Sequence, residues 1–339
     1  MFGSTRHGWI GIDVGASTLT LAQLGRHRGR VELLAAASVQ RARSDNPADA
    51  LRDDLETALA VAGDLRGKRV AAMVSMASCQ LGPGRMPIGQ AGEASEACVG
   101  TWPTGIETSD PDKGWYTLAA DVEVVRTIAD ELLSAGLSCR TVDGAPMAIA
   151  RAVGMVASTE SSSKKRATGG IDWGWSSAMF CSVISGYPVY VRKLKNCGLA
   201  DAALALTKEV NITFEDARDA LTRHLPLAPG APSADDPVCA ELGQLLRPYF
   251  DRFKAEVQRT IDHLRIHRQQ ANPAALRLLG GGAMMSHVAD WLASSIQLPT
   301  RIWQPPGIDN QDHDWPVLGP AISLSTLAWQ KKRVVRKAA

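Results

Sequence analysis

The chain has 339 residues, of which 45% are hydrophobic and 21% are charged, so it is long enough for two domains with a large apolar core. Its formal net charge of +2 gives no basis for nucleic acid as a partner. The six cysteines are scattered without a close pair, which excludes a zinc-binding pattern and a dense disulfide framework and favours a reducing cytoplasm.

The hydrophobic pattern predicts neither a secretory leader nor a membrane span. After Arg6 and His7 the chain reads as a strand interrupted by Asp13, whereas a signal peptide has an unbroken apolar segment. No stretch approaches about 18 apolar residues, roughly the length that a helix needs to cross a bilayer.

The first half of the chain predicts an alternating α/β layout. Alternating apolar residues predict strands at 9–13, 19–24, 31–38, 70–75 and 115–119. Helical spacing of apolar residues predicts helices at 46–63 and 122–135. Residues 79 to about 113 are rich in Gly, Pro and small side chains, and no element is expected there.

The second half contains two expected loops and a long helix. Residues 158–168 and 225–237 are polar or proline-rich and are typical of exposed connections. One apolar stripe runs over 238–267 and predicts a single long helix packed on a sheet. His263 and His267 lie one helical turn apart on it, but without a third ligand we expect a surface pair rather than a metal site.

The C-terminal run Lys331–Lys337 is strongly basic. A solvated terminus is favoured, because few apolar residues accompany the charges. Contact with anionic lipid or an acidic partner is the alternative.

Two segments share one pattern: residues 10–18 read Ile-Gly-Ile-Asp-Val-Gly-Ala-Ser-Thr, and residues 170–177 read Gly-Ile-Asp-Trp-Gly-Trp-Ser-Ser. Each predicts a strand, a tight turn and a second strand around a polyanion. Gly15 and Gly174 let the backbone approach a phosphate. Asp13 and Asp172, at the strand ends, are placed to hold water on a Mg²⁺ ion. Taken singly, each segment is more typical of an ordinary hairpin, because such turns are common.

A third segment, Leu-Leu-Gly-Gly-Gly-Ala at 278–283, predicts a glycine turn that opens a helix. In this order the three segments are similar to the phosphate 1, phosphate 2 and adenosine motifs of the actin-like ATPase superfamily. The chain resembles its FtsA/PilM family over nearly the whole length. Further stretches that carry the resemblance lie at 135–143, 146–156, 187–194 and 298–305.

This resemblance implies an α/β fold, the two-lobed actin-like (ribonuclease H-like) ATPase fold with an inserted 1C subdomain. Lobe I would comprise residues 1–78, and the 1C subdomain residues 79–142. Residues 143–168 would form the connecting helix and the interlobe loop. Lobe II would span 169–312, and 313–339 would return to lobe I and end in the basic tail.

The resemblance also implies ATP and Mg²⁺ in the cleft between the lobes. Asp13 and Asp172 would hold the metal and act in catalysis, with Asp143 as the only other nearby carboxylate. The residues expected to contact the nucleotide are Gly11, Gly15, Ala16, Ser17, Thr18, Gly174, Trp175, Ser176, Ser177, Arg218, Gly280, Gly281, Gly282 and Ala283.

Trp175 departs from the family pattern, which has a small residue after the phosphate 2 glycine. Strand alternation would place Trp173 and Trp175 on one side of the hairpin. If Trp175 points at the cleft, it crowds the γ-phosphate. The alternative is that both indoles pack under the hairpin or against a helix.

Two further departures concern hydrolysis and the nucleoside. Related heat-shock ATPases have a Glu before the proline of the connecting helix, but here Ala145 precedes Pro146, which argues for slow or no hydrolysis. Where relatives have Ala-Glu-x-x-Lys, this chain has Arg218 in place of the Glu and Leu221 in place of the Lys. Arg218 therefore contacts the nucleoside weakly or belongs to a solvated helix face.

The favoured function is that of a cytoplasmic nucleotide-binding scaffold of type IV pilus or type II secretion assembly, at most a slow or degenerate ATPase. It would dock on the cytoplasmic tail of a PilN-type inner-membrane protein, with residues 79–142 helping to hold that tail. Contacts with other pilus or secretion components and homo-oligomers are expected, and membrane association is indirect. The alternatives are a sugar or carboxylate kinase and an FtsA-like filament-forming protein.

Overall fold

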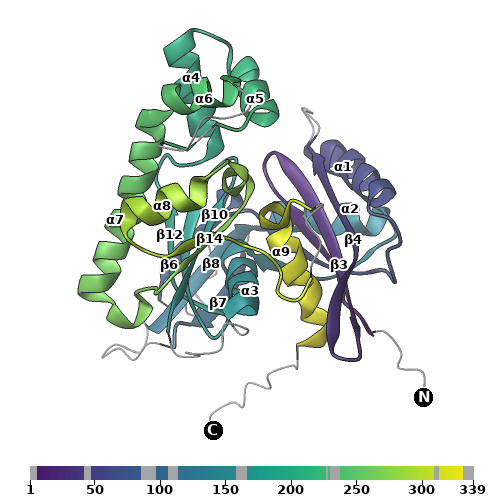
Figure 1. Ribbon diagram of the computed structural model, residues 1–339. Coiled ribbons are helices and arrows are strands. Elements are labelled where there is room, and N and C mark those ends of the chain that lie inside the picture. The colour runs from purple at the N-terminus through teal and green to yellow at the C-terminus, as the bar shows by residue number, and fades with distance from the viewer. Residues whose placement is uncertain are drawn as a thin grey trace.

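The computed structural model describes residues 6–41, 47–84, 97–105, 114–157, 166–226, 228–229, 237–308 and 313–330. The basic run at 331–337 and most of the two predicted loops, 158–165 and 230–236, lie outside these residues. Two lobes are visible in Figure 1, each built on one β-sheet, with helices α3 (Ala145–Ala157) and α9 (Trp315–Ser325) lying between them.

The first lobe is built on a six-stranded sheet. Its order is β1-β3-β2-β5-β9, with β4 also paired to β3, and the strands are β1 (Arg6–His7), β2 (Ile10–Val14), β3 (Thr18–His27), β4 (Arg30–Gln40), β5 (Arg69–Val74) and β9 (Ser138–Gly144). Helices α1 (Pro47–Val61) and α2 (Val122–Ser134) pack together on one face, where Leu55 and Leu132 belong to the same buried cluster as Ile12. The predicted strands and helices of this lobe are confirmed, with ends shifted by a few residues.

The second lobe is built on a five-stranded sheet of order β12-β11-β10-β13-β14. Its strands are β10 (Thr168–Trp173), β11 (Ala178–Ile184), β12 (Tyr187–Leu194), β13 (Leu276–Leu279) and β14 (Thr300–Ile302). Its other helices are α4 (Leu199–Val210), α5 (Phe214–Arg223), α6 (Pro237–Leu245), α7 (Arg247–His267) and α8 (Val288–Ile296). The glycine turn at 280–282 opens a single 3-10 turn, Gly281–Met284, and the next α-helix begins only at Val288.

The prediction of one long helix over 238–267 is wrong, because the chain breaks between α6 and α7 at Leu246. Pro248 lies in the first turn of α7. Proline has no backbone N–H, and its ring clashes with the carbonyl four residues earlier, so a helix cannot run straight through it. The apolar stripe continues across the break because Leu242, Leu246 and Tyr249 are buried in one core.

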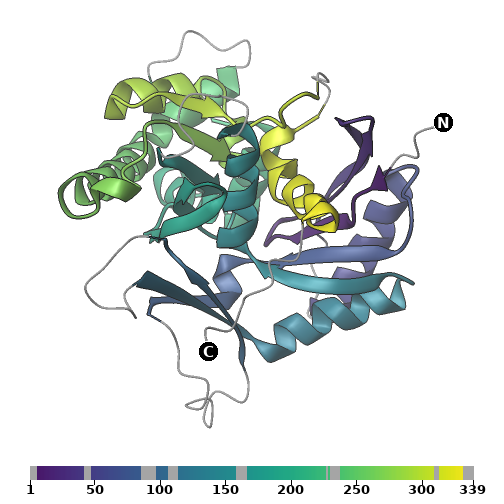
Figure 2. The ribbon, with the colours of Figure 1, turned by 90° about the horizontal axis from the view of Figure 1, so that it is seen from below.

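A third sheet of order β6-β8-β7 lies between β5 and α2 in the sequence. It consists of β6 (Cys79–Pro83), β7 (Ala97–Pro103) and β8 (Trp115–Asp121), and Figure 2 shows it as a layer of its own. The sequence pattern did not predict β6 and β7, since glycine and proline within them hide the strand signal. The strand after α2, β9, pairs in parallel with β5, so the separate sheet covers only the 79–121 part of the expected 79–142 insertion.

The two lobes share one core around α3 and α9. Helix α3 packs on β10, β11 and β12, and α9 packs on β2 and β3. Gly11 of β2 lies so close to α9 that a Cβ atom there would be 1.9 Å from the Ala321 carbonyl oxygen. The Leu24 amide donates to Ser325 Oγ at 2.9 Å, and Ser323 Oγ donates to the Ala148 carbonyl at 2.8 Å. None of the helices in the described ranges combines the length and apolar character needed to cross a membrane.

We predict that Gly11→Ala destabilises the protein by about 1–3 kcal/mol, because the added methyl group overpacks the contact between β2 and α9. Gly100→Ala in β7 is the matched control, since a Cβ there meets no atom within 4 Å. Its free energy of unfolding should change by less than about 0.5 kcal/mol. Urea unfolding followed by circular dichroism measures both, and equal losses would contradict the packing described.

Candidate functional site

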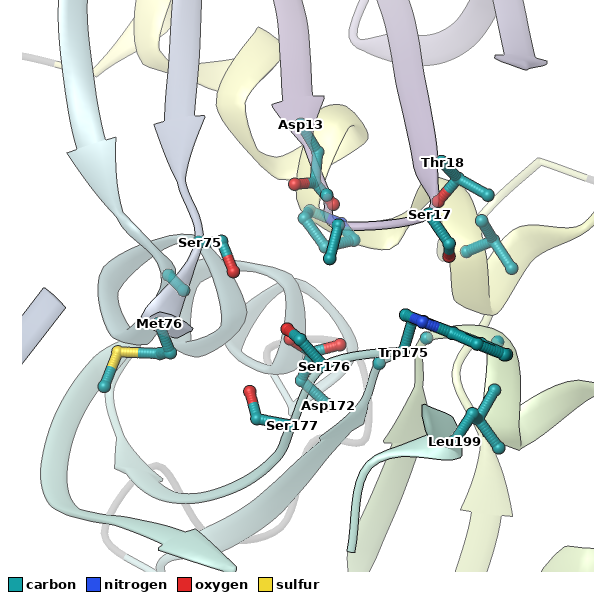
Figure 3. A pocket seen from close by; sticks show the side chains of 18 of the residues that line it. Asp13, Ser17, Thr18, Ser75, Met76, Asp172, Trp175, Ser176, Ser177 and Leu199 are labelled. Atoms are coloured by element: carbon teal, nitrogen blue, oxygen red, sulfur yellow. The ribbon is translucent and has the colours of Figure 1, made fainter. Parts of the chain in front are cut away.

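Two hairpin turns of the same geometry face each other across the cleft between the lobes (Figure 3). In the turn between β2 and β3, the Gly15 amide donates to the Thr18 carbonyl at 3.0 Å. In the turn between β10 and β11, the Gly174 amide donates to the Ser177 carbonyl at 3.1 Å. A Cβ at Gly15 would lie 2.8 Å from the Thr18 carbonyl oxygen, so glycine is needed here for the turn itself.

The turns enclose a cavity of about 120 Å³. Of the residues predicted from the sequence, it is lined by Asp13, Gly15, Ala16, Ser17, Thr18, Asp172, Gly174, Trp175, Ser176, Ser177, Gly280 and Gly281. Residues that the sequence did not suggest as ligand contacts also line it, namely Met73, Ser75, Met76, Ala145, Leu199, Val317 and Pro320. Ser75 follows β5, the parallel neighbour of β2, so knowledge of the strand pairing would have identified it.

Asp13 and Asp172 lie at the ends of β2 and β10 in this cavity. Burial, and secondarily the charge of Asp172, raises the pKa of Asp13 to about 8. Burial raises the pKa of Asp172 to about 6. Asp13 Oδ1 is buried and has no hydrogen-bond partner among the described residues. A pair of half-buried carboxyl groups, one with a buried and unsatisfied oxygen, suits a hard cation such as Mg²⁺, which takes oxygen ligands and keeps several waters.

The cavity fits the metal and phosphate half of a nucleotide. Beside the carboxyl pair, it is lined by five residues that carry hydroxyl groups, namely Ser17, Thr18, Ser75, Ser176 and Ser177. Hydroxyl groups donate to phosphate oxygens, and a bound Mg²⁺ would offset the repulsion between a phosphate and the two carboxylates. At about 120 Å³, however, the cavity is smaller than the roughly 300 Å³ at which ligand pockets begin.

Of the predicted contacts that do not line this cavity, three lie where other parts of the protein fill the space. Gly11 faces α9. A Cβ at Gly282 would lie 2.3 Å from the Trp173 indole, so glycine here makes room for that side chain. Ala283 is buried in the core of the second lobe.

Asp143 also lies outside the cavity between the hairpins. Its carboxylate accepts from Arg151 Nη2 of α3 at 2.6 Å and from the Gly144 amide at 2.9 Å. It lines a second cavity, of about 330 Å³, between the third sheet and β9. The carboxylate of Asp143 therefore lines a different cavity from the one between the hairpins.

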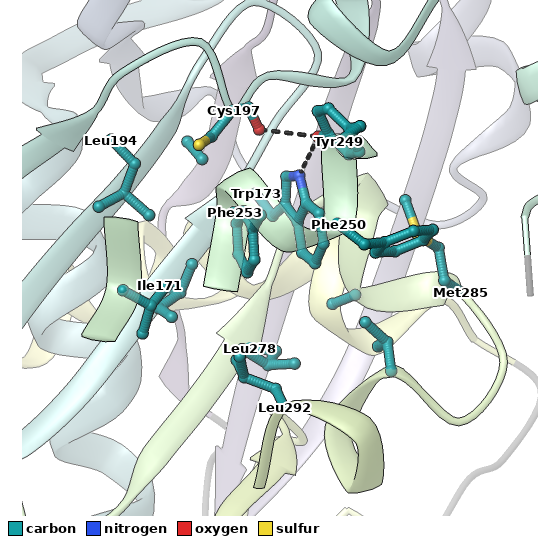
Figure 4. Close-up of a cluster of buried hydrophobic side chains, with 14 of the residues drawn as sticks. Ile171, Trp173, Leu194, Cys197, Tyr249, Phe250, Phe253, Leu278, Met285 and Leu292 are labelled. Atoms are coloured by element: carbon teal, nitrogen blue, oxygen red, sulfur yellow. Dashed lines mark hydrogen bonds between the residues drawn. The ribbon is translucent and has the colours of Figure 1, made fainter. Parts of the chain in front are cut away.

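Trp173 and Trp175 each pack against a helix of the second lobe, which is the second of the two alternatives that the sequence left open. Strand β10 ends at Trp173, so strand alternation does not continue to Trp175. Trp173 is fully buried and stacks on Phe253 with ring centroids 3.6 Å apart. Its Nε1 donates to Tyr249 Oη at 2.8 Å, and that hydroxyl donates to the Cys197 carbonyl at 2.9 Å (Figure 4).

Trp175 instead lines the cavity, and its indole points away from Asp13 and Asp172 toward Leu199 (Figure 3). Its ring packs edge-on against Phe214 of α5 at 6.4 Å. The guanidinium carbon of Arg218 lies 5.4 Å from the indole centroid. Arg218, expected at the nucleoside, thus contacts Trp175.

Comparison with known proteins shows the fold. No protein-family model and no curated protein matches the sequence. The structure is similar to one titled "PilM-PilN type IV pilus biogenesis complex", with a TM-score of 0.73, 19% identity, and 96% of this chain and 99% of that chain covered. It is also similar to the ethanolamine utilization protein EutJ from Carboxydothermus hydrogenoformans (TM-score 0.55, 14% identity, 94% and 89% covered). A third similar structure is MreB5 of Spiroplasma citri bound to AMPPNP (TM-score 0.51, 14% identity, 96% of each chain covered). The chain therefore has the actin-like ATPase fold that its motifs predicted.

We predict that Asp13→Asn stabilises the metal-free protein at pH 8. The pKa of Asp13 in the folded protein, about 8, lies above its ordinary value of 3.8, so folding retains a proton that the unfolded chain has lost. The free energy of unfolding therefore falls as the pH rises from about 4 to about 8, and asparagine removes this cost. One pKa unit corresponds to about 1.4 kcal/mol, so the gain at pH 8 should exceed about 1 kcal/mol and should vanish toward pH 4.

Thermal and urea unfolding in EDTA measure this gain, with Asp53→Asn on the exposed face of α1 as the control for amide substitution. A gain for Asp13→Asn that stays constant from pH 4 to pH 8 would contradict the buried proton.

Proposed function

We propose that this protein is an actin-like nucleotide-binding scaffold of type IV pilus or type II secretion assembly that docks on the cytoplasmic tail of an inner-membrane protein. The observation that carries the proposal is the similarity to PilM, which covers 96% of this chain and 99% of that one. Because the alignment covers nearly all of both chains, it includes the third sheet as well as the nucleotide cleft. The PilM structure is a complex with PilN, so the proposed partner is a PilN-type tail.

The cleft supports binding of Mg²⁺ and phosphate without efficient hydrolysis. Phosphoryl transfer in this fold needs a residue that orients the attacking water. Among the described residues that line the cavity, the carboxylates are Asp13 and Asp172, and no Glu or Gln is present. Ala145, at the start of the connecting helix, offers only a methyl group. Slow or degenerate ATP turnover is the consequence.

The cavity of about 330 Å³ beside the third sheet is the proposed docking groove for the tail. It lies between β7 and β8 on one side and β9, α2 and α3 on the other. Strand β7 forms one edge of its sheet, and the exposed residues at 98–101 face solvent there. An exposed strand edge offers unpaired amide and carbonyl groups to an extended peptide.

The lining of this groove indicates the chemistry of the tail. Most of its side chains are apolar, including Val99, Val125, Met147 and the indole of Trp102. Asp143 is the single charged residue among the described ones that line it, and its charge is partly met by Arg151. An extended tail with apolar side chains and one amide or cationic donor near Asp143 fits this surface. Docking would bring the protein to the inner face of the cytoplasmic membrane, beside other assembly components and further copies of itself.

We predict that Val99→Glu weakens tail binding at least tenfold, because it replaces an apolar wall by a second carboxylate near Asp143. Val210→Glu is the matched control, since Val210 on α4 is 41% exposed and Val99 is 42% exposed. The probe is a synthetic peptide of the cytoplasmic tail of a PilN-type single-span protein, sought among the neighbouring genes and titrated by fluorescence anisotropy.

Equal weakening by the two substitutions would show that the tail binds elsewhere. No binding of that peptide to the unaltered protein, or the absence of such a neighbouring gene, would overturn the docking function.

A further inference from the structure

The cavity between the hairpins stops before it reaches the nucleoside half of the cleft. Its lining includes residues of both phosphate turns and Gly280 and Gly281. Within the described chain, no residue of α5 lines it, and neither do Gly282 and Ala283. Helix α5, whose Arg218 the resemblance places at the nucleoside, therefore lies outside the cavity that would take the phosphates.

Trp175 stands at the boundary between the two halves. Its indole lines the phosphate cavity and also contacts Phe214 and Arg218 of α5. An edge-on aromatic contact and a cation over an indole face each favour this position modestly. Such contacts are strong enough to hold a side chain and weak enough to be broken by a ligand.

The contact with Trp175 leaves one hydrogen-bond donor of Arg218 unsatisfied. Its Nε is buried and has no hydrogen-bond partner in the described part of the protein. A buried donor without an acceptor destabilises the folded protein, because it has lost its hydrogen bond to water. An acceptor oxygen delivered by a ligand would remove that cost.

The backbone of the turn is fixed, so only the indole itself is free to move. The Gly174 and Trp175 carbonyls accept the first amides of α4, from Leu199 at 3.1 Å and Ala200 at 2.9 Å. A Cβ at Gly198 would lie 2.6 Å from the Trp175 carbonyl oxygen, so the start of α4 is packed directly on the turn. Rotation about the Trp175 side-chain bonds breaks none of these backbone hydrogen bonds.

We infer that Trp175 is the gate of the nucleoside half: it admits phosphate groups to the cleft and excludes a complete nucleotide until its indole leaves Phe214 and Arg218. Once the indole has moved, Arg218 is free to donate to an oxygen of the bound nucleotide. This inference rests on the nucleotide site of the proposed function. According to this inference, the position of the Trp175 side chain determines whether the cleft binds only phosphate groups or a complete ATP molecule.

Isothermal titration calorimetry with two probes, Mg-pyrophosphate and Mg-ATP, tests the gate. Pyrophosphate carries the phosphates without a nucleoside. Trp175→Gly should bind Mg-ATP at least tenfold more tightly than the unaltered protein, with pyrophosphate affinity changed less than about twofold. Trp175→Phe keeps an aromatic ring in place and should change ATP affinity less than Trp175→Gly does.

Arg218→Ala is the second variant, with Arg223→Ala on the same helix as its matched control. The Arg223 guanidinium is exposed and pairs with Asp219. Arg218→Ala removes both a contact that holds the indole and the proposed hydrogen-bond donor to the nucleotide. In the Trp175→Gly background the indole is absent, so only the loss of the donor remains. The double variant should therefore bind ATP more weakly than Trp175→Gly alone. Arg223→Ala should leave affinity for both probes unchanged.

The outcomes separate the gate from the site. Equal ATP affinity in the unaltered protein and in folded Trp175→Gly, while pyrophosphate binds both, overturns the gate and leaves the phosphate site standing. Parallel changes for ATP and pyrophosphate also overturn it, since the indole would then act on the phosphates. If neither probe binds either protein, the nucleotide site itself is refuted, and the gate with it.

Discussion

The close packing of α9 against β2 is the constraint on which the rest of the structure depends. Gly11 allows the Ala321 carbonyl to approach to a distance that any side chain would prevent. Helix α9 also packs on α3, which lies on the sheet of the second lobe, so the two sheets share one buried core. Because this core fixes the lobes to each other, the carboxyl ends of β2 and β10 face one another. The functional site is a product of that packing.

The facing strand ends explain both the chemistry of the cleft and its limits. Two carboxyl groups brought together out of water hold protons at unusually high pH, and a divalent cation would take the place of those protons. The hydroxyl groups of the two turns surround the same space. What the described lining does not supply is a side chain to orient water or an open path to the base. These two features support the proposed scaffold with slow or degenerate ATP turnover.

The parts of the fold that rest on local sequence could be predicted, and those that rest on long-range packing could not. Each Asp-x-Gly turn is closed by a hydrogen bond within the turn, so its geometry follows from its own residues. The reason for glycine at 282 could not be derived, because it depends on the indole of Trp173, more than one hundred residues away in sequence. The position of the Trp175 indole likewise depends on residues distant in sequence, Phe214 and Arg218. The break before α7 had a visible signal in Pro248, which the continuous apolar stripe outweighed.

Steady-state ATP hydrolysis at saturating Mg-ATP tests the central claim most directly, namely that this cleft holds a phosphate ligand without turning it over. The measurement should be made with and without the partner's tail, since docking next to Asp143 lies close to the connecting helix that starts at Ala145. The account predicts turnover far below about one per second in both conditions. Steady turnover at about one per second or faster, by the protein alone, would contradict it.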